Sequence, residues 1–245
     1  MNWTEITYTA IYSSIFMTLF VIAEIMYHKM KVPIEITRKF VHMGTGFVCL
    51  SFPFFLTTHW SVLFLTLCFV VILLLSMKYR LLKSINDVRR TTRGAFLFPI
   101  IIYFMFWIYA IYGQHNFKAV GLENGVYSRF SLGGTIYYFL PILVLTISDP
   151  LAALFGKKWS YGKYSIMGNN KTVVGSLAFF ISAFVLALLF VIPNCVGWQW
   201  GLIICVTIAI LSTIVEALSR KGFDNFLIPI SVTFCLVLFN QFLIL

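Results

Sequence analysis

Asp149 is the residue with the clearest capacity for chemistry, because it lies inside the long apolar stretch ILVLTISDPLAALFG. A carboxylate at that position would lie within a membrane, where burying its charge costs at least ~3 kcal/mol. A cationic side chain or a metal ion must offset that cost. The sequence therefore indicates a functional role for Asp149.

Two more carboxylates, Glu216 and Asp224, stand at the ends of later apolar runs. Together with Asp149 they suit a Mg²⁺–nucleotide site, because Mg²⁺ prefers oxygen ligands and keeps waters and substrate phosphates in its shell. Glu216 also lies four residues before Arg220, a spacing that leaves a local ion pair open as the alternative.

Cations, amides and hydroxyls accompany the carboxylates. Arg38 and His42 are four residues apart and would share one face of a helix. Gly175 and Ser176 follow Lys171 and would open a helix whose N–H groups can receive phosphate. The other candidates are Lys39, Arg93, Asn170, Thr172 and Asn225. Such a set suits phosphoryl transfer, which depends mostly on positioning and charge stabilisation.

The composition indicates an integral membrane protein. Of the 245 residues 60% are hydrophobic and only 11% charged, against about 25% charged in a soluble domain. The net charge of +10 is best explained by basic cytoplasmic loops, and we expect no nucleic-acid partner. The fold class expected is all-α and polytopic, in a single membrane domain over residues 1–245.

Eight transmembrane helices are expected, because a span needs about 20 mostly apolar residues. They cover approximately 7–27, 40–56, 60–77, 95–112, 135–155, 172–192, 200–218 and 226–244. With both termini on the non-cytoplasmic side, sixteen of the eighteen Lys and Arg residues fall in cytoplasmic loops, as the positive-inside rule requires. All the candidate residues then face the cytoplasm, at the plasma membrane if the source is prokaryotic.

Several short motifs, in this order, resemble the CTP-dependent lipid-alcohol kinase family, which includes dolichol kinase, phytol kinase and the CTP-using diacylglycerol kinase. The similarity to CDP-diacylglycerol synthase is more distant. The motifs are RKFVH from Arg38, Arg93-Gly94, SDPLAALFG from Ser148, NKTVVGS from Asn170, and Glu216 followed by DNFLIP from Asp224. The resemblance covers residues 38–245, the expected catalytic bundle, and leaves the first span, about 7–27, peripheral.

The resemblance implies a role for each candidate. Asp149 would be the central metal-linked carboxylate, and Glu216, Asp224 and Asn225 would complete the metal and nucleotide site. Lys171 would hold nucleotide phosphates. Arg38, Lys39 and His42 would contact phosphate or orient the lipid hydroxyl. The implied cofactor is Mg²⁺, the implied phosphoryl donor is CTP, and the substrate would be a polyprenol, a phytol-like isoprenoid or diacylglycerol.

Two other functions stay open from the sequence. A cytidylyltransferase would use the same groups to release pyrophosphate and form a CDP-lipid, although the longer ending of those synthases is not found here. A small transporter would line a path with Asp149 and Glu216, although the outer halves of most spans are apolar or aromatic. The sequence also leaves open a homo-oligomer.

Overall fold

The computed structural model describes residues 3–79, 81–82, 84, 94–117, 132–166, 169–195, 197–220 and 222–243. These residues form helices and one short β-hairpin, so the all-α class predicted from composition is confirmed. The helices are α1 (Trp3–His28), α2 (Ile34–Leu50), α3 (Phe52–Phe55), α4 (His59–Tyr79), α6 (Gly94–Phe117), α7 (Leu132–Leu143), the π-helical η1 (Val144–Ser148), α8 (Asp149–Lys158), α9 (Val173–Val191), the 3-10 turn η2 (Ile192–Asn194), α10 (Trp198–Leu218), α11 (Asp224–Leu238) and the 3-10 turn η3 (Asn240–Phe242).

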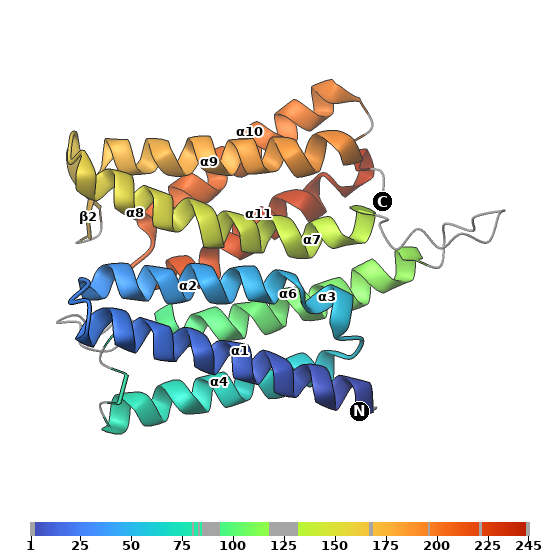
Figure 1. Ribbon diagram of the computed structural model, residues 1–245. Helices are drawn as coiled ribbons and strands as arrows, with labels where there is room; N and C mark the ends of the chain where they lie inside the picture. The colour runs from blue at the N-terminus through green and yellow to red at the C-terminus, as the bar shows by residue number, and fades with distance from the viewer. Residues whose placement is uncertain are drawn as a thin grey trace.

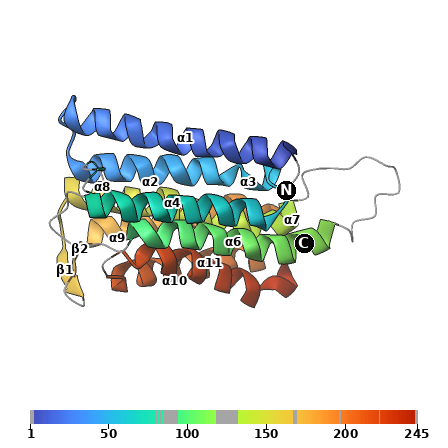
Figure 2. The ribbon, with the colours of Figure 1, turned by 90° about the horizontal axis from the view of Figure 1, so that it is seen from below.

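The long helices run side by side in a bundle (Figures 1 and 2). Both chain termini lie at one end of this bundle, and the β-hairpin lies at the other end (Figure 1). The start of α2 and the end of α8 are at the hairpin end, which is therefore the end that gathers the candidate residues (Figure 1).

Each of the eight expected spans coincides with a helix or helical run, with ends that differ by a few residues. Five stretches of the described chain are long and apolar enough to cross a membrane: Trp3–His28, His59–Tyr79, Gly134–Lys158, Val173–Asn194 and Trp198–Leu218. They indicate an integral membrane protein. The apolar helices Gly94–Ala110 and Asp224–Leu238 are shorter, so the count of eight and the sidedness of the termini stay predictions.

The run through α7, η1 and α8 is the central helix of the bundle. In its most apolar stretch of 18 residues 61% of the residues are buried, against 28 to 39% in the other four candidate spans. The helix continues through Asp149 to Lys158, so the expected extension of this span past Ser148 is present. Its π-helical segment ends one residue before Asp149, and π segments of this kind occur frequently at functional sites.

The hairpin joins β1 (Lys163–Ile166) to β2 (Asn169–Thr172) in antiparallel register, with Tyr164 opposite Lys171. The hairpin was not predicted, because the expected fold class contained helices alone. A hydrogen bond of 2.5 Å between the hydroxyls of Tyr164 and Ser176 ties β1 to the first turn of α9. The hairpin thereby fixes the position of Lys171.

Close packing between α2 and the central helix depends on Gly46. A Cβ atom at that position would lie 2.2 Å from Oγ1 and 2.9 Å from Cβ of Thr146. Rotating the Thr146 side chain cannot relieve a clash with its own Cβ, so the two helices would have to separate. At Gly44 an added Cβ would meet only the end of the Leu19 side chain, at 3.1 Å.

We therefore expect Gly46→Ala to destabilise the protein by about 1–3 kcal/mol, the usual cost of overpacking. Gly44→Ala is the matched control, on the same helix, and should be neutral or slightly stabilising because alanine favours helix. Thermal unfolding in detergent measures both. Equal midpoints for the two variants would contradict the packing role of Gly46.

Candidate active site

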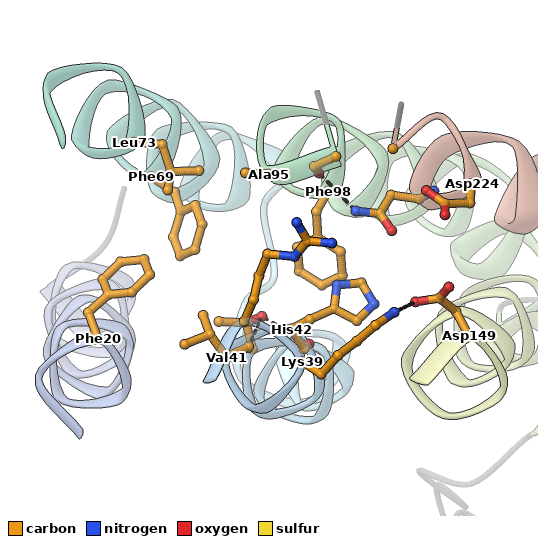
Figure 3. A pocket seen from close by; sticks show the side chains of 15 residues that line it. Phe20, Lys39, Val41, His42, Phe69, Leu73, Ala95, Phe98, Asp149 and Asp224 are labelled. Carbon is orange, nitrogen blue, oxygen red and sulfur yellow. Dashed lines mark hydrogen bonds and ion pairs between the residues drawn. The ribbon is translucent and has the colours of Figure 1, made fainter. Parts of the chain in front are cut away.

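Asp149 is 6% exposed and forms an ion pair with Lys39 of α2 (Figure 3). The side chains of Asp149 and Lys39 are 9% and 21% exposed, so water screens the pair only weakly. Lys39, which is 110 residues earlier in the chain, thus supplies the positive charge that was expected to offset the buried Asp149 carboxylate. This contact joins the start of α2 to the central helix.

The π-helical segment explains how His42 meets the same helix. In the π register the carbonyl of one residue pairs with the N–H five residues later. For Leu145 that residue is Pro150, which has no N–H to give. The Leu145 oxygen instead lies 3.4 Å from Nε2 of His42. Because a carbonyl can only accept, Nε2 carries the hydrogen, and the neutral ring keeps its lone pair on Nδ1.

The start of α11 brings the third group of candidates. Asp224 faces the α2 residues across the site (Figure 3), and Asn225 lines the same pocket. The Asn225 side-chain nitrogen donates to the carbonyl oxygen of Gly94 at 2.9 Å. A Cβ at Gly94 would lie 2.9 Å from that same nitrogen and 3.2 Å from Cα of Gly222. Glycine is required at residue 94 for α6 and α11 to meet here.

These residues enclose a pocket of about 130 Å³ with two distinct halves (Figure 3). Asp149 and Asp224 lie on one side, Phe20, Phe69 and Leu73 lie on the other, and Lys39 and His42 stand between them. The residues that line it are Phe20, Arg38, Lys39, Val41, His42, Thr45, Phe69, Leu73, Gly94, Ala95, Phe98, Asp149, Gly222, Asp224 and Asn225. One cavity therefore offers both a charged and an apolar surface.

Lys171 and Glu216 form a second buried ion pair. Lys171 also donates to the backbone oxygen of Glu216 at 3.2 Å. Burial acts to lower the pKa of Lys171, but the charge and hydrogen bond of Glu216 outweigh it and raise the pKa above its usual value, so Lys171 is protonated at neutral pH. Glu216 thus pairs with a distant lysine rather than forming the local pair with Arg220 that the spacing left open.

The three carboxylates lie within electrostatic range of one another without forming a compact cage. The negative charges of Asp149 and Asp224 repel each other, and both also repel the carboxylate of Glu216. Among the described side chains, no three His, Cys, Asp or Glu residues are close enough to hold one metal ion together.

A Mg²⁺ ion nevertheless fits the residues present. It commonly takes only one or two carboxylates and completes its shell with waters and substrate phosphates. Asp149 and Asp224 line the same pocket. In addition, Oε2 of Glu216 is buried with no hydrogen-bond partner, a condition that a cation or a bound water would relieve.

Three of the remaining candidates, Thr172, Gly175 and Ser176, have local partners. The Thr172 hydroxyl caps α9 by accepting from the N–H of Gly175 at 3.1 Å, so that N–H is already engaged. Ser176 is bonded to Tyr164. Asn170 is an exposed residue of β2. Arg93 lies outside the described residues.

The apolar half of the pocket was missed by sequence reasoning. Thr45 is 2% exposed and lines the pocket from the same face of α2 as Arg38 and His42. Its position seven residues after Arg38 was a usable signal, because residues at i, i+4 and i+7 share a helix face. Phe20 and Phe69 carried no such signal, since aromatic residues are ordinary in a spanning helix.

Comparison with known proteins finds phytol kinase of Synechocystis sp., which is 29% identical over 203 residues. The match spans 81% of this chain and 76% of that protein. It confirms the resemblance to the CTP-dependent lipid-alcohol kinases that the motifs predicted. No protein-family model and no solved structure matches the chain.

The buried pair gives a prediction about stability. Lys171→Met should destabilise the protein by about 3–5 kcal/mol, because the Glu216 charge is left buried without its partner. Glu216→Gln added to Lys171→Met should restore most of that loss. Equilibrium unfolding in mixed micelles measures each variant. Lys157→Met with Glu35→Gln, which removes the exposed pair, is the control and should change little. A double variant as unstable as Lys171→Met alone would contradict the pairing.

Proposed function

We propose that this chain, which resembles phytol kinase along four fifths of its length, transfers the γ-phosphoryl group of CTP to the hydroxyl of a membrane lipid alcohol. The observation that carries the proposal is the two-sided pocket. Its charged half suits phosphates and its apolar half suits hydrocarbon, and the boundary between them falls at Lys39 and His42 (Figure 3). An amphiphilic substrate would lie across that boundary with its hydroxyl beside the charged groups.

Charge balance supports a nucleotide with a divalent cation. Three cationic residues, Arg38, Lys39 and Lys171, stand against the carboxylates Asp149, Glu216 and Asp224. This cluster is nearly neutral on its own, so it cannot by itself neutralise a triphosphate. Mg²⁺ held by Asp149 and Asp224 would supply positive charge to the phosphate oxygens, as divalent ions do in phosphoryl transfer.

The protein's own residues would then position the reactants. Lys39 already reaches across the pocket to Asp149 and can turn its ammonium group toward a phosphate oxygen. Lys171, fixed by the hairpin and Glu216 within electrostatic range of Asp149, would contact the phosphates as well. Both ammonium groups would stabilise the charge that spreads over the transferring group.

The reaction balances as a direct displacement. The lipid hydroxyl oxygen attacks the γ-phosphorus, the bond from that phosphorus to the β,γ-bridging oxygen breaks, and CDP leaves with the electron pair. The hydroxyl proton passes to a base as the new bond forms. His42 is suited to accept it, because the hydrogen on Nε2 faces Leu145 and the lone pair on Nδ1 remains available.

Asp149→Asn should abolish turnover, a loss of at least about a thousandfold, because it removes the carboxylate at the centre of the charged half. Purified protein, γ-labelled CTP and a panel of lipid alcohols measure this. Glu35→Gln, which changes an exposed carboxylate, should retain the wild-type rate. Labelled phospholipid and CDP are the expected products. Release of pyrophosphate with a CDP-lipid would replace the kinase by a cytidylyltransferase, and no lipid product from any alcohol would end the proposal.

Chelation of divalent ions should remove the activity, and added Mg²⁺ should restore it. Asp224→Asn should raise the Mg²⁺ concentration needed for half-maximal rate by about tenfold or more, since even loss of an outer-shell partner has that effect. A Mg²⁺ titration of both proteins at saturating CTP is the measurement. Identical Mg²⁺ dependence in the two would remove Asp224 from the metal site.

A further inference from the structure

A second cavity adjoins the apolar half of the pocket. The two share Thr45, Phe69 and Phe98 as a common wall. The second cavity has a volume of about 20 Å³, much less than the first, and none of its exposed wall is polar. It is lined by Phe16, Thr45, Cys49, Phe52, Leu65, Thr66, Phe69, Phe98, Pro99 and Ile102. The second cavity therefore lies beyond the apolar half of the pocket, in the interior between α1, α2, α4 and α6.

We propose that this path, from the pocket past Thr45, Phe69 and Phe98 into the second cavity, is the binding channel for the hydrocarbon chain of the lipid alcohol, and that it takes one chain only. The inference rests on the proposed function and specifies its substrate class. It favours a single-chain isoprenoid alcohol over diacylglycerol, because a second cavity of about 20 Å³ is too narrow for two acyl chains side by side.

The side chains at the junction suit a hydrocarbon. The Thr45 hydroxyl donates to carbonyl oxygens of its own helix, 2.7 Å to Val41 and 3.1 Å to His42. It therefore leaves no unpaired polar atom against an apolar chain. The ring of Phe69 packs against those of Phe16 and Phe20, with centroids 5.6 and 5.1 Å apart. These aromatic contacts make the wall of the channel rigid.

The channel also aligns the head of the substrate with the reacting groups. The Phe98 ring packs against His42 with centroids 4.7 Å apart, so a chain that runs along Phe98 ends beside His42. His42 in turn stands between the apolar half and Asp149 (Figure 3). Burial of the chain would thereby hold the hydroxyl in place for attack, which is how binding energy remote from the reaction contributes to rate.

The test is the chain-length preference of a variant that narrows the junction. Thr45→Leu adds bulk where the two cavities meet. In assays of geraniol, farnesol and geranylgeraniol, the ratio of kcat/KM for geranylgeraniol to that for geraniol should fall by about tenfold relative to wild type. Thr207→Leu is the matched control, because Thr207 makes the same type of bond to its own helix but is only partly buried and lies on α10, outside the lining of both cavities. It should leave that ratio unchanged.

A second measurement does not depend on a variant folding. Wild-type protein in detergent is irradiated with farnesol carrying a diazirine at its far end. The label should attach to residues of the inner cavity such as Cys49, Phe52 and Leu65. Excess unlabelled geranylgeraniol should reduce the labelling, and excess phosphatidylcholine should not, which distinguishes a substrate chain from a structural lipid.

The outcomes separate the inference from the function it rests on. Phosphorylation of the alcohols with an unchanged length ratio in Thr45→Leu, or with labels only on lipid-facing residues such as Val185 and Leu189 of α9, would overturn the channel and leave the kinase. Efficient use of diacylglycerol would overturn the single-chain limit. If no alcohol is phosphorylated, the proposed function fails, and the labelling pattern still decides whether a hydrocarbon chain occupies the channel.

Discussion

The neutralisation of one carboxylate inside the apolar bundle is the constraint on which the other features depend. Asp149 lies on the central helix at a depth where an unpaired charge is very unfavourable. Lys39 offsets that charge directly, so the start of α2 must lie against the junction of η1 and α8. Once α2 is held there, Arg38, His42 and Thr45 necessarily face the same pocket, because they share one side of the helix. A single ion pair therefore determines which surface of α2 becomes the wall of the site.

The sequence Ser148-Asp149-Pro150 does more than place a carboxylate. Proline removes the N–H that the Leu145 carbonyl would otherwise use in the π register, and that carbonyl is the partner of His42. His42 thus contacts the π-helical turn itself, and Lys39 contacts Asp149, the residue that follows this turn. Gly46, one helical turn beyond His42, allows the close approach at Thr146 that both contacts require. The π-helical turn and the close packing at Gly46 together hold Lys39 and His42 against the central helix.

Much of the helical layout was predictable, because eight long apolar runs separated by basic loops leave few alternatives for a membrane protein. The gathering of the carboxylates and cations near one end was also predictable, since they stand at the ends of runs that this layout brings together. The ion-pair partners of these groups were not predictable from the sequence. Glu216 is near Arg220 in sequence but pairs with Lys171, because the hairpin, stabilised by the register of Tyr164 with Lys171, extends the lysine toward α10. Nothing in the spacing of Gly162, Tyr164 and Lys171 distinguishes that hairpin from a mobile loop.

The apolar half of the pocket could not be separated from the rest of the spans by composition. In a soluble protein a buried aromatic row is recognised by its contrast with polar neighbours, but a spanning helix is apolar on its lipid-facing side as well. The same four-residue spacing that lipid-facing residues show is found in Phe16 and Phe20, and in Leu65, Phe69 and Leu73. Helix α2 breaks this uniformity, because it presents charge and apolar surface along one face, from Arg38 through His42 and Thr45 to Cys49. In the proposed function, one rigid helix would therefore contact both ends of an amphiphilic substrate, with the hydrocarbon chain near Cys49 and a phosphate near Arg38.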